Sequence, residues 1–168
     1  MSEPESGRPM LVVIQRSEAF ADAWPSLAEE SGMSVVTADP DALPSPAEAS
    51  AVVLVLAGEE AGVAAALEGL PYAPRVLAVV GADADRRVAI AAIRAGAGEY
   101  FALPADLAML RSWLEERASD RVRDERARTL TREQRARYDF SRMIGESAGL
   151  RAALERAAKV IPRGSATI

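Results

Sequence analysis

The stretch RVLAVVGADADRRVAIAAIRAGAGEYFAL, residues 75–103, decides the fold. It opens with an apolar run, 75–81, that is typical of a buried strand. Residues 83–97 then carry apolar side chains at helical spacing and end in a glycine-containing turn, and residues 99–103 predict a second strand. A strand, a connecting helix and a second strand favour a parallel pair of strands with a right-handed crossover.

The same alternation extends over most of the chain. Apolar and β-branched runs predict further strands, at 10–15, 33–38 and 51–58. Helices are predicted between them and after the last strand, over 17–32, over 59–70 and from about 105 to 137. Strands and helices in this order predict an α/β fold, a flavodoxin-like (βα)5 doubly wound parallel sheet. Its ligand crevice would lie at the carboxyl ends of the strands.

The first predicted helix, 17–32, contains signals that disagree with one another. Ser17 is a candidate N-cap residue, and Gly32 stands where a glycine commonly ends a helix. Pro25 falls between them and removes a backbone donor, so it is expected to kink or split the helix.

The composition limits the chemistry that the chain can perform. It has no cysteine and no histidine, and its only lysine is Lys159. These absences remove thiolate ligands, the commonest general base and the commonest metal ligand. We therefore expect no catalytic residue, no metal site and no cofactor. The net charge of −5 argues against general binding of nucleic acid.

The sequence also predicts where the chain resides. No apolar run approaches the ~20 residues that a membrane-spanning helix needs. The first nine residues, MSEPESGRP, are polar and acidic, unlike a secretory signal, and are expected to form a disordered leader, 1–9. We expect a cytoplasmic protein with no membrane partner.

The predicted helix after residue 105 is long and highly charged. It carries one apolar seam, formed by Leu107, Leu110, Leu114 and Ala118, which continues weakly to Val122 and Leu130. Beyond Ala118 the seam is too sparse for a strong leucine zipper. Two interpretations stay open, a solvated single helix and a helical linker that dimerises.

Residues 81–104, GADADRRVAIAAIRAGAGEYFALP, resemble the fourth and fifth units of bacterial response-regulator receiver domains. With the predicted layout, the resemblance extends over roughly 10–117. It implies a receiver-like core over 10–104, followed by a last helix that extends into a linker, 105–138.

The carboxyl-terminal segment, 139–168, carries a second resemblance. FSRMIGESAGL, followed by a predicted helix and SATI, looks like the entry to the AAA+ domain of sigma-54-dependent transcription activators. The segment is therefore interpreted as the truncated edge of that domain. Receiver, helical linker and AAA+ entry, in this order, resemble an activator of the nitrogen-regulator type. Its full-length parent would be an ATPase, and sigma-54 RNA polymerase and DNA would be bound only through parts beyond this sequence.

Every receiver residue that handles a phosphoryl group is replaced in this chain. The resemblance places Gln15 and Arg16 at the Mg²⁺-binding acids and Leu56 or Ala57 at the phosphoacceptor aspartate. It places Gly81 at the hydroxyl position and Leu103 at the lysine position. The acidic residues near the predicted crevice stand at the wrong offsets: Glu18, Glu59 and Glu60. We therefore expect neither phosphorylation nor metal binding.

Two features of the receiver pattern are retained. Tyr100 matches the switch aromatic residue, although packing of a strand aromatic on the neighbouring helix is the favoured explanation for it. Pro104 matches the proline whose preceding peptide bond is often cis in the family, here the Leu103–Pro104 bond.

These observations favour a regulatory module that acts through protein contacts. We expect a homodimer formed through the helix at 83–97, the strand at 99–103, the following helix and the linker. The residues of this dimer face are Arg86, Arg87, Arg94, Asp106, Leu110 and Leu114, with Glu115 as a further partner for ion pairs. For the three arginines, a solvated helix face is an equally good interpretation. The alternative is a sensor that binds a nucleotide second messenger or another anion in the vacated crevice. Independent catalysis has no complete motif to support it.

Overall fold

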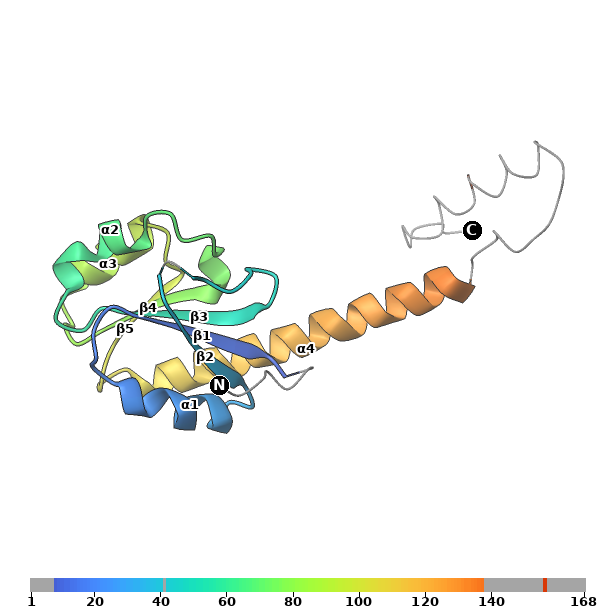
Figure 1. The fold of residues 1–168 in the computed structure, drawn as a ribbon, viewed down its shortest axis with the longest axis horizontal. Helices are drawn as coiled ribbons and strands as arrows, with labels where there is room; N and C mark the ends of the chain where they lie inside the picture. The colour runs from blue at the N-terminus through green and yellow to red at the C-terminus, as the bar shows by residue number, and fades with distance from the viewer. Residues whose placement is uncertain (1–7, 41, 138–155, 157–168) are drawn as a thin grey trace, which may run out of the picture. The chain divides into compact units, whose positions relative to one another are not determined.

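The computed structural model of the chain describes residues 8–40 and 42–137, together with Arg156. The chain divides into two compact units, Met1–Arg123 and Asp124–Ile168. The first unit contains a five-stranded sheet with the order β2-β1-β3-β4-β5, and all of its neighbouring strands are parallel (Figure 1). This order is the flavodoxin-like one. The predicted fold class is therefore confirmed.

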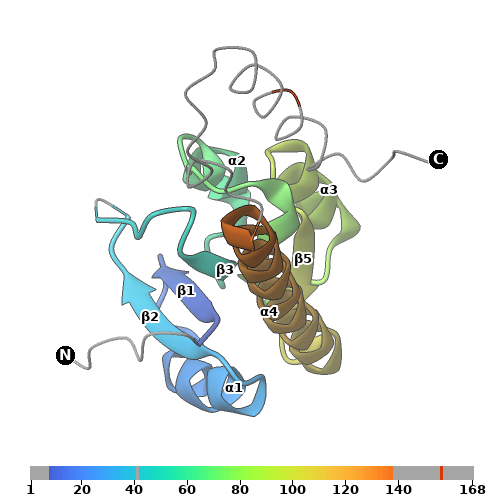
Figure 2. The ribbon, with the colours of Figure 1, turned by 90° about the vertical axis from the view of Figure 1, so that its right-hand side faces the viewer.

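The strands lie close to their predicted positions: β1 (Met10–Gln15), β2 (Ser34–Ala38), β3 (Ala49–Val55), β4 (Leu77–Gly81) and β5 (Glu99–Ala102). Every residue of β3 and β4 is buried, as expected of central strands that are covered on both faces. Figure 2 shows β2 and β5 at opposite edges of the sheet. Because all five strands are parallel, their carboxyl ends lie at the same end of the sheet, where the crevice is predicted.

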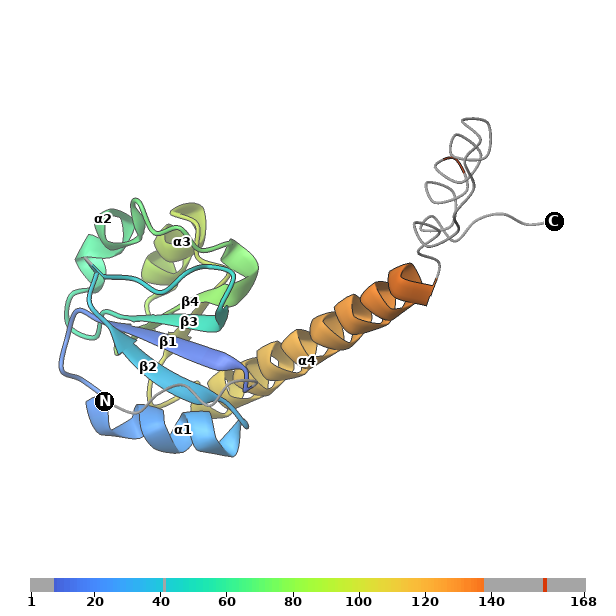
Figure 3. The same ribbon diagram turned by 45° about the vertical axis from the view of Figure 1, so that its right-hand side comes forward.

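Two helical layers cover the sheet (Figure 3). On one face, α1 (Trp24–Glu30) and the first part of α4 (Leu107–Arg137) pack on the alternate strand residues Val13, Val53 and Val80. On the other face, α2 (Val63–Leu67) and α3 (Arg86–Arg94) pack on the intervening residues, which include Val12, Leu54 and Val79. The apolar strands therefore contribute to two separate cores.

The start of α1 corrects one prediction. A short 3₁₀ helix, η1 (Ala21–Ala23), precedes α1, and Pro25 lies in the first turn of α1. A proline is tolerated there because the first helical amides have no partner within the helix. The Oγ atom of Ser17, the predicted cap residue, accepts a hydrogen bond from the backbone amide of Ala19. It therefore does not cap the helix. Gly32, with φ of +70°, ends the helix as predicted.

The described part of the second unit is the portion of α4 from Asp124 onward, together with Arg156. Its Thr129 and Thr131 hydroxyls donate to the carbonyls four residues earlier. The predicted edge of an AAA+ domain, apart from Arg156, and most of the predicted leader lie outside the described residues. None of the described helices has the length and apolarity of a membrane span.

Candidate functional site

The carboxyl ends of four neighbouring strands, β1, β3, β4 and β5, bring the predicted crevice residues to one edge of the sheet. Leu56 directly follows β3 and is 1% exposed, and its amide donates to the carbonyl of Val80 at 2.8 Å. Leu103 directly follows β5 and is buried, and its amide donates to the carbonyl of Gly81 at 2.9 Å. Both side chains are apolar, so neither can accept a phosphoryl group or pair with one.

Gln15 and Arg16 lie at the end of β1. The side chain of Gln15 is half-buried, and its Nε2 atom has no hydrogen-bond partner among the described residues. Arg16 is exposed, and its amide donates to the carbonyl of Val55 at 3.1 Å. A guanidinium group repels Mg²⁺, so this end of the strand offers no attractive metal ligand pair. Within the described parts of the chain, no three acidic side chains are grouped as metal ligands.

Glu60 supplies the charge that the crevice contains. It is the first residue of η2 (Glu60–Gly62), and it is 9% exposed. Its Oε2 atom accepts a hydrogen bond from the amide of Gly58 at 2.9 Å. Its Oε1 atom accepts from the amides of Ala82 at 2.7 Å and Asp83 at 3.3 Å. One carboxylate therefore joins the loop that follows β3 to the loop that follows β4.

These contacts determine the ionisation of Glu60. Burial on its own raises the pKa of the Glu60 carboxyl, but the backbone hydrogen bonds from Ala82, Gly58 and Asp83 outweigh it. The resulting pKa lies below the ordinary value for glutamate. In the described part of the chain, no cation forms an ion pair with this carboxylate. Backbone amides therefore hold the negative charge.

Gly81 leaves the space that Glu60 and Tyr100 occupy. A Cβ atom at position 81 would clash with the Tyr100 hydroxyl and would lie 3.0 Å from both Cγ and Oε1 of Glu60. Any larger side chain there, including one with a hydroxyl group, would have to displace one of these two residues. The absence of a hydroxyl at position 81 and the inward position of Glu60 therefore belong to one arrangement.

Tyr100 completes this group of residues from β5. Its ring packs against the core on the α3 side of the sheet, and its hydroxyl donates to the carbonyl of Asp83 at 2.6 Å. Burial, followed by the nearby charges of Glu60, Asp83 and Asp106, raises the pKa of Tyr100 to about 12. The phenol is therefore neutral at physiological pH and serves as a hydrogen-bond donor. The packing role and the position beside the crevice coexist in this residue.

The junction between β5 and α4 holds two further predicted residues. The Leu103–Pro104 peptide bond is cis, as the resemblance implied. Asp106 is half-buried, and its Oδ2 atom accepts a hydrogen bond from the amide of Ala102 at 2.9 Å. One oxygen of this carboxylate is thus already bound within the chain.

The expected dimer face is only partly on the surface. Arg86, Arg87 and Arg94 are exposed on α3, beside Ile90 and Ile93, which are 40% and 47% exposed. Leu110 and Leu114 are both 0% exposed and belong to the core beneath α4. Their assignment to a dimer face is therefore wrong, because the apolar seam of α4 covers the sheet of its own chain.

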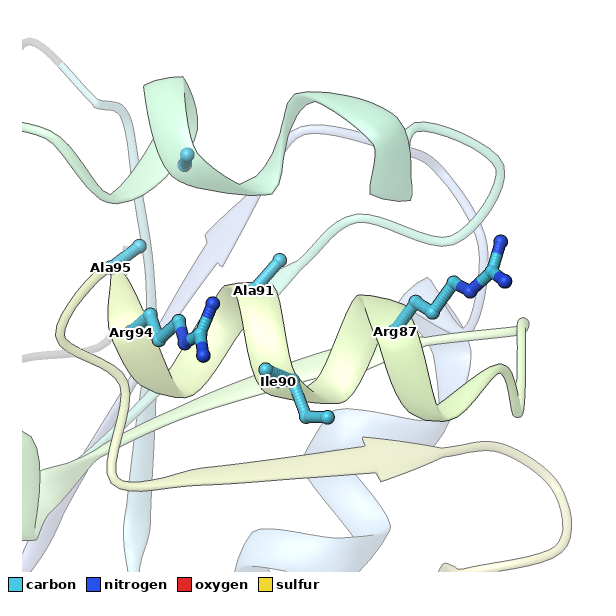
Figure 4. A pocket seen from close by; sticks show the side chains of 6 residues that line it. Arg87, Ile90, Ala91, Arg94 and Ala95 are labelled. Carbon is cyan, nitrogen blue, oxygen red and sulfur yellow. The ribbon is translucent and has the colours of Figure 1, made fainter.

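Two grooves border this surface. The first, with a volume of about 510 Å³, lies where Ala91 of α3 and Ala95, directly after this helix, face α2, with Arg87 and Arg94 along it (Figure 4). The second, about 410 Å³, lies between β5 and α4. It is lined by Glu99, Phe101, Ala108, Met109, Ser112, Trp113 and Glu116. The first groove is bordered by basic side chains and the second by acidic ones.

Sequence reasoning placed Glu60 near the crevice but gave it no role. Its offset differs from the receiver pattern, and the contacts of its carboxylate depend on the turn that brings η2 back over the strand ends. The signal that could have identified it is a glutamate between two glycines, Gly58 and Gly62, directly after a central strand. The two other nearby acids, Glu18 and Glu59, are exposed.

No protein-family model matches this sequence, and no curated protein matches it. Solved structures of CheY-like proteins are similar to it. A CheY-like protein (TadZ) from Pseudomonas aeruginosa is 20% identical, with 64% of this chain and 93% of that chain covered and a TM-score of 0.46. A Burkholderia pseudomallei response regulator, solved with a phosphorylated aspartic acid, is 21% identical, with 95% and 99% covered and a TM-score of 0.45. A CheY-like response regulator from Mesorhizobium loti is 17% identical, with 66% and 98% covered and a TM-score of 0.46.

Proposed function

We propose that this chain is a receiver-like regulatory module that works without phosphorylation and controls its partners through protein contacts. The observation that carries the proposal is the chemistry of the crevice. Its strand ends present Leu56 and Leu103, and its one buried charge, Glu60, is already bound to backbone amides among the described residues. Because the described residues of the crevice include neither a nucleophile nor a pair of metal-binding acids, we assign signalling to the surface.

The surface that we assign to this role lies around the β5 edge of the sheet and is called the α3–β5–α4 surface. It consists of Arg86, Arg87, Ile90, Ile93, Arg94, Glu99, Met109 and Glu116. Basic residues lie on α3, and acidic residues lie on β5 and α4. A twofold axis brings the same surface of two copies together, so a patch that carries both signs can complement itself. We therefore propose a homodimer through this surface, without Leu110 and Leu114.

The larger context is part of the same proposal. The module would precede the AAA+ domain of a sigma-54-dependent activator and regulate assembly of that domain. The sequence of the segment at 140–150 and its position after the long helix α4 support this context. Contacts with sigma-54 RNA polymerase and DNA would belong to other parts of such a protein.

The proposal can be tested by treating the whole chain with acetyl phosphate and Mg²⁺ and measuring its intact mass and its sedimentation. We expect the mass and the oligomeric state to remain unchanged. A Mg²⁺-dependent gain of one phosphoryl group would contradict the proposal. The anion-sensor alternative stays a prediction. The amides of Gly58, Ala82 and Asp83, which could bind an anion, already bind Glu60.

A further inference from the structure

The loops that follow β3 and β4 point backbone amides at one place. Gly58 lies in the first loop, and Ala82 and Asp83 lie in the second. Their three N–H groups converge on the two carboxylate oxygens of Glu60, at 2.7–3.3 Å. Successive amides that point into a concavity form an anion-binding arrangement, and charge-assisted hydrogen bonds of this kind are stronger than neutral ones.

The position of Glu60 is costly unless these contacts are made. A buried carboxylate loses its hydration, and an isolated one would become neutral. The opposite shift is found, because the pKa of Glu60 is lowered by the amides despite burial. Gly58, Ala82 and Asp83 are themselves exposed, and their amides gain a charged acceptor, which forms stronger hydrogen bonds than a neutral one. The amides of Gly58, Ala82 and Asp83, which we call the amide cradle, and the carboxylate of Glu60 therefore stabilise each other.

Besides the two loops, Gly81 and Tyr100 border the space that the Glu60 carboxylate occupies. The missing side chain at position 81 leaves room for the carboxylate, and the Tyr100 hydroxyl closes the same space while binding the carbonyl of Asp83. The contacts of Glu60 and Tyr100 thus meet at one loop, the one that contains Ala82 and Asp83. Loss of the anion would release the amides of this loop, to which the Tyr100 hydroxyl is also bound.

We infer that the amides of Gly58, Ala82 and Asp83 form a binding site for a small oxyanion, and that Glu60 fills this site as the chain's own ligand. The ligand class is a carboxylate or a phosphate, whose oxygens can take the same donors. With Glu60 in place, the two loops and Tyr100 keep one arrangement without any external signal. This inference deepens the proposed function and rests on it: the receiver-like crevice is held by an internal anion.

The experiment removes the internal ligand and supplies an external one. The variant Glu60→Ala leaves the amides in place, and the matched control is Glu59→Ala, which removes the neighbouring exposed glutamate. Both variants and the unaltered chain are titrated with sodium acetate and with sodium phosphate, against sodium chloride at the same ionic strength. The readouts are the amide NMR resonances of Gly58, Ala82 and Asp83 and the thermal unfolding midpoint.

We expect acetate or phosphate to shift these three resonances saturably in Glu60→Ala, and to raise its unfolding midpoint more than in the control. The control corrects for the general stabilisation that phosphate gives to folded proteins. A folded Glu60→Ala variant without saturable shifts would overturn the inference. If the variant is unfolded in chloride, acetate or phosphate must restore its circular dichroism spectrum, because a ligand that binds only the folded state stabilises it. Failure to restore it would also overturn the inference.

These outcomes are separate from those of the phosphorylation test. Phosphorylation of the unaltered chain would refute the proposed function, whatever the behaviour of the variant. If Glu60→Ala does not respond to acetate or phosphate, the three amides do not form an oxyanion site. That result would not affect the proposal that the module works through protein contacts without phosphorylation. Acetate that binds and phosphate that does not would restrict the site to carboxylates.

Discussion

The charged side chains of the crevice and of the α3–β5–α4 surface differ in their burial and in their hydrogen bonding. In the crevice, the carboxylate of Glu60 is buried and its oxygens are bound by three amides. On the surface, the arginines of α3 are exposed, as are the apolar side chains of Ile90, Ile93 and Met109. The contrast indicates that the charge of Glu60 is already satisfied by groups of its own chain. The surface, by comparison, has exposed apolar and charged groups that a partner could contact.

The largest expected effect concerns the boundary between core and surface. Leu114→Ala should lower the free energy of unfolding by about 2–5 kcal/mol, because it opens a cavity beneath α4. The control Leu130→Ala removes a side chain that is 59% exposed and should change the free energy by less than about 0.5 kcal/mol. Urea unfolding measures both. If Leu114→Ala has normal stability but an altered oligomeric state, Leu114 contacts a partner chain and its assignment to the core is wrong.

The next effect concerns the closed crevice. Glu60→Gln keeps the size of the side chain but turns an NH₂ group or a single carbonyl oxygen toward three donors. We expect a loss of about 1–3 kcal/mol in the free energy of unfolding, because a neutral group replaces the buried carboxylate that accepts hydrogen bonds from three amides. Glu59→Gln, one residue earlier and exposed, should cost little. Similar losses in the two variants would mean that Glu60 is no more important than a surface glutamate.

The pH dependence of stability follows from the lowered pKa of Glu60. A carboxyl whose pKa is lower in the folded state contributes stability above its unfolded pKa, and that stability is lost as the pH falls through the folded pKa. Tyr100, which is close to the charges of Glu60, Asp83 and Asp106 and has its pKa raised to about 12, stays neutral throughout this range. The difference in unfolding free energy between the unaltered chain and Glu60→Gln should therefore shrink as the pH falls below 4.5, the ordinary pKa of a glutamate. A constant difference would show that the Glu60 charge does not contribute.

The smallest effect concerns the surface charges. Replacing Arg87 and Arg94 together by glutamate should weaken self-association by up to about 1 kcal/mol per residue, since exposed ion pairs contribute little individually. Arg16→Glu, an exposed arginine at the crevice, is the control for a change in net charge. Sedimentation equilibrium over a range of concentrations compares the variants. A control that weakens association as much per charge would argue against this face.

Much of the fold could be predicted because its determinants are local. The strand runs and the apolar spacing of 83–97 specify their elements directly, and β1 has its predicted bounds, 10–15. Pro25 was harder to interpret, since a proline fits either a kink or a first turn, and only the path of the preceding residues decides between them.

The candidate site could be predicted only in part. The replaced positions follow from alignment with the strand ends, so Leu56, Gly81 and Leu103 were found. The role of Leu114 does not follow from the sequence. An apolar seam indicates that this face of the helix is buried, but not whether it packs on the sheet of its own chain or on a second copy. The role of Glu60 does not follow from the sequence either, because two of its three donors, Ala82 and Asp83, are more than twenty residues away and approach it only after folding.

The most direct test of the central claim, a crevice closed by the chain's own carboxylate, is an amide NMR titration of the unaltered chain with beryllium fluoride and Mg²⁺. The resonances of Gly58, Ala82 and Asp83 report on the three donors that bind Glu60. We predict that these resonances remain unchanged throughout the titration. Saturable shifts of these amides that require Mg²⁺ would contradict the claim, because they would mean that the crevice still accepts a phosphoryl-like group.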